Sequence, residues 1–506
     1  MKGKRIPRVY IVGAGFAGVS LAIELKKKEV LGEVVAFLDD DPGKIGRKIE
    51  GIPVLGPIES VIPLLDKHAS DEALIALPSA EHERLVEVYR LLEEADFARI
   101  RILPTLSQVI DGGAHFIQTR EIDPQDLLGR TPVPIDLRKS LSYLRGKRVL
   151  VTGAGGSIGS ELCRQLLSGG ADRLYLFGHG ENSIYEIDRE LRLLQEEGVG
   201  EKATIVPVIG EIQDADYMRY ILRRLRADVV LHTAAYKHVP LMEANPVAAI
   251  ANNVFGTRNL VTAAKEAGVE RFVFISTDKV VSPVGVYGAS KRIAEEIVLQ
   301  ASAPHAADTS SNATSTSANG TFMVVRFGNV LSSRGSIVPL FQKQIARGGP
   351  VTVTHPEVSR YYMTIPEASS LVLQAGGVGS AGTLYVLDMG EPLPIREMAE
   401  QLITFSGFTP YEDIDISFVG LRPGEKLCEQ LVADYERVEP SEYDRISRIE
   451  RKPWSDDRLT ELLSRLRPVC YFDESRPDDY RARRRLREII HEYIPSVPVP
   501  DDEPEY

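Results

Sequence analysis

The sequence predicts an α/β fold with two doubly wound parallel sheets, the second of which carries a smaller carboxyl-terminal lobe. Two observations support this fold class. Apolar, strand-like runs alternate with helical stretches along most of the 506 residues, and a glycine-rich turn follows the first strand of each half. Strands that alternate with helices form parallel sheets, because each return to the same edge needs a crossover. We therefore expect two Rossmann-like domains, at residues 1–110 and 146–440.

The composition narrows the class of protein. Apolar residues make up 43% and charged residues 26%, as in ordinary globular proteins. The net charge of −12 argues against a general nucleic-acid binder, which needs a basic surface. Three distant Cys residues give neither a disulfide framework nor a metal pattern, so no metal is expected. No apolar run reaches the ~18–20 residues of a membrane helix, and no signal peptide is visible, so we expect a cytoplasmic protein, with peripheral membrane association left open.

The first glycine-rich turn indicates a nucleotide site. A strand from Val9 runs into Gly13, Gly15 and Gly18 in G-x-G-x-x-G spacing, and Asp39 ends the next strand about 20 residues later. Glycines let a phosphate approach the backbone, and the acid could bind a ribose hydroxyl. No nucleophile or acid/base cluster is found here, so we expect ligand binding without chemistry, or no ligand. Further strands are expected at 53–55, 73–77 and 101–103, with a helix at 81–94.

Three segments interrupt or follow these patterns. Residues 111–145 are rich in Gly and Pro, and we expect a connector with short helical pieces. Residues 301–320 are rich in Ser, Thr, Ala and Asn without aromatics, which indicates a disordered surface insertion. The charged extension 441–506 contains the run RARRRLREII, which predicts an amphipathic helix that packs on the body, forms an oligomer contact or meets an acidic surface. The substrate lobe is expected mainly at 330–435.

The second glycine-rich turn indicates a dinucleotide site with a different spacing. Gly153, Gly156 and Gly159 follow a strand and open a helix as G-x-x-G-x-x-G, which is typical of short-chain dehydrogenase-like folds. The second strand is expected from Arg173 to Asn182, and its end carries His179 and Glu181 where an Asp would usually bind the adenosine ribose, so NAD is expected with NADP left open. The other residues expected to bind this cofactor are Ser157, Ile158, Glu211, Ile212, Ala234, Ala235, Asn253, Tyr287 and Lys291.

The stretch from Arg271 to Glu296 has the layout of a reactive site. Thr277, Asp278 and Lys279 end a buried strand, and Tyr287 and Lys291 are four residues apart, so they share one face of a helix. The alternative is a solvated loop with a weak Asp–Lys ion pair, followed by a surface helix. The upstream glycine turn favours the reactive interpretation, because ligands of such sheets bind at the carboxyl ends of the strands.

Residues in the loops after the strands are candidates for substrate binding. Lys237 and His238 follow the fourth strand, although a lone His is often a structural hydrogen-bonding group. Three arginines in Gly- or Pro-marked loops predict a diphosphate clamp, since guanidinium binds phosphate in a bidentate manner, whereas each alone is more often a surface ion pair. The candidates in these later loops are Asn329, Arg334, Arg360, Arg422 and Glu425.

Together these motifs resemble the bacterial polysaccharide-biosynthesis nucleotide-sugar 4,6-dehydratases of the capsule and flagellin-glycosylation type, in the extended short-chain dehydrogenase/reductase superfamily. Long-form members also carry the first domain. They usually begin with membrane helices and often have Met in place of Tyr287, whereas short relatives that invert carbon 5 keep Tyr. We therefore expect a soluble variant or a fragment, and the outcome at carbon 5 stays open. The resemblance rests on TGAGGSIGSE (152–161), AAYKHVPLMEANP (234–246), ISTDK (275–279), RFGNVL (326–331), SRYYMTIPEA (359–368), LDMGEP (387–392) and GLRPGEKL (420–427).

The resemblance implies dehydration of a UDP-N-acetylhexosamine, with UDP-N-acetylglucosamine as the expected substrate, to a 4-keto-6-deoxy sugar. Tyr287 would remove the 4-hydroxyl proton, Lys291 would lower the pKa of Tyr287, and Thr277 would bind the same oxygen. A neutral Lys279 would take the proton from carbon 5, and Asp278 would protonate the departing 6-hydroxyl. A nucleotide-sugar 4-epimerase and a non-catalytic nucleotide sensor or scaffold are the alternatives. A homo-oligomer is expected by analogy with the superfamily.

Overall fold

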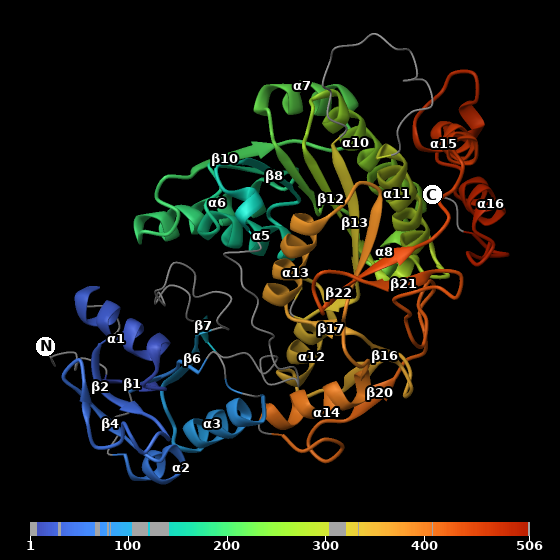
Figure 1. Cartoon of the computed structure of the whole chain (residues 1–506). Helices are drawn as coiled ribbons and strands as arrows, with labels where there is room; N and C mark the ends of the chain where they lie inside the picture. The colour runs from blue at the N-terminus through green and yellow to red at the C-terminus, as the bar shows by residue number, and fades with distance from the viewer. Residues whose placement is uncertain are drawn as a thin grey trace, which may run out of the picture. The chain divides into compact units, whose positions relative to one another are not determined.

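A computed structural model describes residues 8–28, 32–65, 71–77, 80, 82–103, 120–121, 141–302, 320–331, 333–406 and 408–503. The chain divides into two compact units, Met1–Leu137 and Arg138–Tyr506 (Figure 1). Most of the expected connector and insertion, at 104–119, 122–140 and 303–319, lies outside the described residues.

The N-terminal unit is built on a sheet in the order β3-β4-β2-β1-β5-β6-β7. The central strand β1 pairs in parallel with β2 and β5, and only the pairings of β3 with β4 and of β6 with β7 are antiparallel. Alternate residues of β1 enter separate apolar clusters, so both faces of the sheet are covered. The elements are β1 (Arg8–Val12), α1 (Phe16–Lys28), β2 (Glu33–Leu38), β3 (Lys48–Ile49), β4 (Ile52–Leu55), α2 (Ile58–Val61), β5 (Glu72–Ile75), α3 (His82–Glu94), β6 (Arg99–Ile102) and β7 (Arg120–Glu121).

The second unit contains a sheet in the order β10-β9-β8-β11-β12-β13-β18-β22-β21. The chain builds β8, β9 and β10 outward on one side and then returns to place β11, β12 and β13 on the other side, which is the doubly wound order with a switch point at β8. The predicted fold class is confirmed. The strands are β8 (Arg148–Thr152), β9 (Arg173–Gly178), β10 (Thr204–Ile209), β11 (Val229–His232), β12 (Arg271–Thr277), β13 (Thr321–Phe327), β18 (Thr383–Leu387), β21 (Arg437–Pro440) and β22 (Ile446–Glu450).

Helix α11 (Val286–Ala301) is the most deeply buried helix near the centre of this unit, since the residues from Val286 to Leu299 are all buried. Small residues, Gly288, Ala289 and Ser290, allow its first turns to pack closely against neighbouring elements. The π-helical turn η6 (Ala251–Gly256) also contacts it. The other helices that cover the sheet are α5 (Ser157–Ser168), α6 (Glu181–Glu196), α7 (Ala215–Leu225), α8 (Val239–Ala244), α9 (Pro246–Ile250), α10 (Thr257–Glu266) and α13 (Ile365–Val378).

Three small two-stranded sheets lie in the chain after β13. The pair β14 with β17 and the pair β15 with β20 are parallel, whereas β16 with β19 is antiparallel. They bring residues near 330, 360 and 420 into one region around α12 and α14 (Figure 1). The elements are β14 (Asn329–Val330), α12 (Ile337–Ile345), β15 (Val351–Val353), β16 (Ser359–Arg360), β17 (Tyr362–Met363), β19 (Leu393–Pro394), α14 (Ile395–Phe405) and β20 (Ile416–Phe418).

The C-terminal segment packs on the same apolar core as α11. Helices α15 (Asp456–Cys470) and α16 (Arg483–Tyr493) contribute Leu462 and Ile490 to the cluster that also contains Ile293. Figure 1 shows both helices in red; α15 contacts α11, and α16 contacts α15 and α9. The predicted amphipathic helix therefore packs on the body of the second unit. Among the residues that the structure describes, no helix is both long and apolar enough to cross a membrane.

Candidate active site

The turn between β8 and α5 is closed so tightly that it requires glycines. Gly153 has φ +69°, and a Cβ there would lie 2.8 Å from Thr233 Oγ1 and 2.9 Å from the Ala234 backbone. A Cβ at Gly159 would lie 2.2 Å from the Gly153 carbonyl oxygen. Helix α5 opens directly behind this turn with Gly156 at its N-cap, so its first N–H groups are available to an anion. This cradle fits the phosphates of a dinucleotide.

The other predicted cofactor residues follow the carboxyl ends of neighbouring strands. The sequence extends the second strand to Asn182, but β9 ends at Gly178 and α6 begins at Glu181, with Gly180 as its N-cap. The strand stops early because Gly180 and the acid at the first helical position favour a helix start. Ser157 and Ile158 open α5 directly after the glycine turn. The other predicted cofactor residues at the carboxyl edge of the sheet are His179 and Glu181 after β9, Glu211 and Ile212 after β10, and Ala234 and Ala235 after β11.

Asn253 lies in η6 and holds the loop that follows β11. Its Oδ1 accepts a hydrogen bond from the Tyr236 N–H at 2.9 Å, and its Nδ2 donates to the Tyr236 carbonyl at 2.9 Å and to Ser290 Oγ at 3.0 Å. The side chain is buried. These contacts fasten the loop to α11, and a contact with the cofactor stays a prediction.

The polar corner at the end of β12 is a buried cluster in which the hydrogen bonds to Asp278 converge on one of its two carboxylate oxygens. Thr277 Oγ1 donates to Asp278 Oδ1 at 2.8 Å, and Lys279 Nζ donates to the same oxygen at 2.9 Å. Lys279 Nζ also donates to Asn329 Oδ1 at 2.9 Å. Asp278 is fully buried, yet its Oδ2 makes no hydrogen bond to any residue that the structure describes. An acceptor oxygen is thus available beside the Lys279 amine.

Tyr287 and Lys291 lie on α11 beside this corner, and burial shifts the pKa of both. Burial raises the pKa of Tyr287, the charges of Asp278 and Glu429 raise it further, and a hydrogen bond with Thr277 lowers it. Burial lowers the pKa of Lys291 to about 7, while the charge of Glu295 acts in the opposite direction. Lys291 Nζ donates to the Ile275 carbonyl at 2.5 Å. Perturbed groups that gather at a strand end are typical of a reactive site.

Three residues near this corner escape the sequence analysis. Tyr362, in β17, shares a hydrogen bond with Asn329, and burial raises its pKa. Lys426 and Glu429 line one pocket together with Lys279 and Tyr287. Lys426 lies at the end of a predicted loop and Glu429 follows it, but the residue types do not reveal how deeply these side chains are buried or with which groups they pair. The only sequence signal is their position directly after the Arg-Pro-Gly-Glu stretch.

Lys237 and His238 follow β11, as predicted, and precede α8. Burial lowers the pKa of Lys237, and burial followed by the charge of Lys237 lowers the pKa of His238. A Cβ at Gly335 would lie 2.5 Å from His238 Cε1, so the loop after β14 packs on the histidine ring. The two residues are therefore close to the loop that carries Arg334.

The three arginines predicted to form one clamp have different neighbours. Arg334 donates from its backbone N to Ser157 Oγ at 3.0 Å and from Nη1 to the Gly155 carbonyl at 3.2 Å, so it contacts the glycine turn. Arg360 donates to the Lys426 and Leu427 carbonyls, both at 2.8 Å. Arg422 pairs with Glu425 at 2.6 Å. Arg422 thus lies in the 420–427 loop, Arg360 contacts that loop, and Arg334 lies at the predicted cofactor edge. A shared diphosphate stays a prediction.

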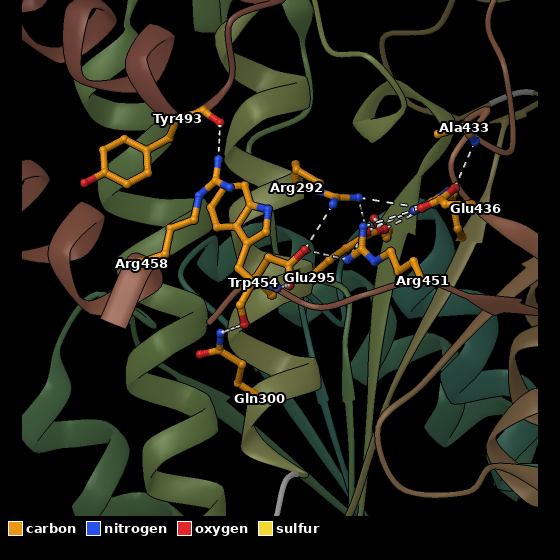
Figure 2. A network of polar contacts seen from close by, with 12 residues as sticks. Arg292, Glu295, Gln300, Ala433, Glu436, Arg451, Trp454, Arg458 and Tyr493 are labelled. Atoms are coloured by element: carbon orange, nitrogen blue, oxygen red, sulfur yellow. Dashed lines mark hydrogen bonds and ion pairs between the residues drawn. The ribbon is translucent and has the colours of Figure 1, made fainter. Parts of the chain in front are cut away.

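On its other side, α11 contributes to a buried network of three positive and three negative side chains (Figure 2). Arg451 lies 3.2 Å from Glu295 and 3.0 Å from Glu296, and Ser276 Oγ donates to Glu295 at 2.7 Å. Because Ser276 directly precedes Thr277, the network links the reactive corner to the C-terminal segment. Its members are Arg292, Glu295 and Glu296 of α11, Arg326 of β13, Glu436 and Arg451, and each side chain is at most 7% exposed.

The predicted nucleotide site of the N-terminal unit has an equally tight turn. Gly13 has φ +103°, a Cβ at Gly18 would lie 1.9 Å from the Gly13 carbonyl oxygen, and a Cβ at Gly15 would meet no atom within 4 Å. Asp39 accepts from the Ala14 N–H at 2.7 Å and from the Asp41 N–H at 2.8 Å. One carboxylate oxygen of Asp39 therefore stabilises the glycine turn and the other the loop after β2, and a ribose contact stays a prediction.

Comparison with known proteins gives the family. Residues 149–451 match the family described as "Polysaccharide biosynthesis protein", and residues 2–104 match that described as "CoA-binding domain". The probable polysaccharide biosynthesis protein EpsC of Bacillus subtilis is 44% identical over 426 residues, which cover 84% of this chain and 68% of EpsC. The capsular polysaccharide biosynthesis protein CapD of Staphylococcus aureus is 43% identical over 440 residues, which cover 87% of this chain and 70% of CapD.

More distant similarities extend to an enzyme and a solved structure. An inverting UDP-N-acetylglucosamine 4,6-dehydratase of Campylobacter jejuni is 29% identical over 289 residues, which cover 57% of this chain and 78% of that enzyme. The X-ray structure of Pen from Bacillus thuringiensis has a TM-score of 0.52 at 31% identity, and the match covers 62% of this chain and 89% of Pen. The family match spans more than half of the chain, and the resemblance found in the motifs is confirmed. The chain belongs to the polysaccharide biosynthesis protein family.

Proposed function

We propose that the protein is a nucleotide-sugar 4,6-dehydratase that acts on a UDP-N-acetylhexosamine, with UDP-N-acetylglucosamine as the substrate of choice, in surface polysaccharide biosynthesis. The observation that carries the proposal is the buried pair Asp278–Lys279 beside Tyr287 at the carboxyl end of β12. An acid and a base beside the tyrosine suit chemistry at carbons 5 and 6 of a sugar. The similarity to the Campylobacter jejuni dehydratase supports the same reaction class.

A dinucleotide would be held by the glycine cradle between β8 and α5, with Gly153, Gly156 and Gly159 against its phosphates. When bound, the nicotinamide would accept a hydride from carbon 4 and return it at carbon 6. We assign NAD as the cofactor, because the carboxylate of Glu181 near the end of β9 would repel the 2′-phosphate of NADP.

Tyr287 removes the proton of the 4-hydroxyl group in this scheme, and Thr277 hydrogen-bonds the same oxygen. Burial holds the pKa of Tyr287 high, so the tyrosinate needs a nearby positive charge. Lys291 supplies that charge from the same face of α11 when it is protonated. Because its own pKa lies at about 7, Lys291 exchanges protons readily near neutral pH.

Elimination of water then uses Asp278 and Lys279. The ketone at carbon 4 acidifies the carbon-5 hydrogen, which leaves as a proton to Lys279 once the Lys279 ammonium has passed a proton to Asp278 across their 2.9 Å hydrogen bond. A protonated Asp278 gives its proton to the oxygen on carbon 6, the carbon–oxygen bond breaks, and one water departs. Return of a proton to carbon 5 completes the 4-keto-6-deoxy sugar. The shared contact of Lys279 with Asp278 and Asn329 keeps its amine at this position.

Two other functions use the same fold. A 4-epimerase needs Thr277 and the Tyr287–Lys291 pair but not the acid and base, and a sensor or scaffold would bind without turnover. Incubation with UDP-N-acetylglucosamine and NAD, followed by mass spectrometry of the nucleotide sugar, separates the three. Loss of one water supports the dehydratase, an epimer of unchanged mass supports the epimerase, and binding without turnover supports the sensor.

Lys279→Ala tests the role of the base. The variant should lose water elimination while it binds NAD as tightly as the wild type, because Lys279 lies at the reactive corner and outside the glycine cradle. Nucleotide binding is measured by calorimetry alongside the mass assay. Normal turnover in Lys279→Ala would contradict the assigned role.

For the N-terminal unit, a nucleotide would bind at Gly13, Gly15 and Gly18 without chemistry. The match of residues 2–104 to a CoA-binding domain makes coenzyme A the first ligand to titrate into the full chain.

A further inference from the structure

Glu429 is a buried carboxylate in the reactive pocket that the scheme above leaves without a role. Its exposed fraction is 7%. It lines the pocket together with Lys279, Tyr287 and Lys426. The residue follows the 420–427 loop and therefore reaches the reactive corner from a part of the chain far from β12 and α11.

The hydrogen bonding of Glu429 is incomplete. Its Oε2 lies 3.1 Å from Lys426 Nζ, but it makes no hydrogen bond to any residue within the described part of the chain. Lys426 Nζ donates instead to the Val281 carbonyl at 2.7 Å. Buried carboxylate oxygens almost always accept hydrogen bonds, so this oxygen, which has an ion-pair contact with Lys426 but no hydrogen bond within the described residues, can accept one from a ligand.

Glu429 does not help Tyr287 to lose its proton. Its negative charge raises the pKa of Tyr287, which works against a tyrosine base. A ligand donor placed on the carboxylate would reduce this effect and satisfy the oxygen in the same step. The pocket thus contains an acceptor that can gain a hydrogen bond when a ligand is bound.

The segment that directly follows Glu429 is fastened to the charged network. Arg326 donates to the Leu431 carbonyl at 2.9 Å, and Glu436 accepts from the Ala433 N–H at 2.9 Å. Figure 2 shows Glu436 beside Ala433, with Arg451 next to them in the network. A side chain carried by such a rigid segment can select one orientation of a ligand.

We propose that Glu429 is a substrate-positioning residue that accepts a hydrogen bond from a hydroxyl or amide N–H of the hexose ring. This contact holds the ring against Tyr287 and Lys279. The inference rests on the proposed function, because it places a nucleotide sugar in the pocket.

Calorimetric titration of the full chain with UDP-N-acetylglucosamine and with UDP alone tests this inference. Glu429→Gln keeps the size of the side chain and removes its charge. Hydrogen bonds to charged groups typically change affinity by about 10- to 100-fold. The variant should lose affinity for the nucleotide sugar by that factor and keep its affinity for UDP within about twofold. Equal loss for both ligands, or no loss, overturns the proposal.

The pH profile of turnover separates contact with the substrate from a purely structural role. Glu429→Gln removes a charge that raises the pKa of Tyr287, so the limb of kcat/KM that reports the tyrosine should move to lower pH. Glu429→Asp keeps the charge but withdraws the carboxylate, so it should weaken sugar binding and leave that limb in place. A limb that stays unchanged in Glu429→Gln contradicts the proximity of the two groups.

Lys426→Met is the matched control. If Glu429 acts only by holding Lys426 on the Val281 carbonyl, this variant should reproduce the selective loss of sugar affinity, and that result overturns the proposal. We expect the loss in Glu429→Gln alone. Failure of the proposed function gives a different result: the wild type then binds the sugar more tightly than UDP through Glu429 and releases no water.

Discussion

Glu436→Gln removes one of the three negative charges from the buried network around α11. Glu436 accepts hydrogen bonds from Arg326 Nη1 at 2.7 Å and from Nη2 at 3.0 Å, and Arg451 Nη1 lies 3.5 Å from the same carboxylate. Glutamine keeps the shape of the side chain but turns one acceptor into a donor that faces guanidinium groups. The three arginines then share two carboxylates in a site that excludes water.

Loss of one partner from a buried ion pair costs about 3–5 kcal/mol, because the remaining charge stays desolvated. We therefore expect Glu436→Gln to reduce the free energy of unfolding of the second unit by about that amount. With an unfolding entropy of about 2 cal/mol/K per residue, a unit of this size should lose roughly 4–6 °C in melting temperature.

Trp454 reports this transition. It is the one Trp of the sequence, and its backbone N–H donates to Glu296 in the network at 3.1 Å. Urea unfolding followed by tryptophan fluorescence thus monitors the second unit. Glu439→Gln on β21 is the control, since its side chain is 30% exposed and surface pairs contribute about 0–1 kcal/mol. If Glu436→Gln destabilises the protein no more than Glu439→Gln does, the network does not stabilise α11 as argued.

Two further outcomes follow from the contacts of α11. Arg487 donates to Glu243 Oε2 at 2.9 Å, and Glu243 Oε1 accepts from the Val286 N–H at 2.6 Å, so Arg487→Met should displace the start of α11 and lower kcat about tenfold. Arg484→Met, on the exposed side of α16, should leave kcat unchanged. Equal kcat values for the Arg487→Met and Arg484→Met variants would refute the link between Arg487 and the start of α11. The Lys291 pKa of about 7 lies below its value of about 10.4 in unfolded chains, so the folded protein binds fewer protons between these limits and its stability rises with pH. Lys291→Met should lack this rise in urea unfolding between about pH 7 and pH 10, and parallel curves would refute it.

Much of the fold could be predicted because its signals are local. Glycines that permit a tight turn, the strand before them and the helix after them lie within about 20 residues, and the order of strands and helices then implies parallel sheets. The spacing of Tyr287 and Lys291 was equally informative, since it places both on one helix face. Strand ends were less well predicted, as at Gly178, because hydrogen bonding and caps decide them.

Residues whose roles depend on distant partners could not be predicted in this way. Arg334 was grouped with Arg360 and Arg422 because all three stand in similar loops, yet Arg334 contacts the glycine turn. Loop composition does not reveal which side of the sheet a loop faces. Tyr362 was missed for the same reason, since only the pairing of β14 with β17 brings it to Asn329.

The sequence by itself determined which residues form the polar corner, because Thr277, Asp278 and Lys279 are consecutive and Tyr287 follows on the next helix. Only the tertiary structure decided how deeply that corner is buried and which distant groups complete it. Burial shifts the pKa of Tyr287 and Lys291, Glu429 lines the same pocket from a distant part of the chain, and buried charges join α11 to the C-terminal segment. Charge pairing in a water-free interior acts through space between segments far apart in the chain, which is why neither effect can be read from the order of residues.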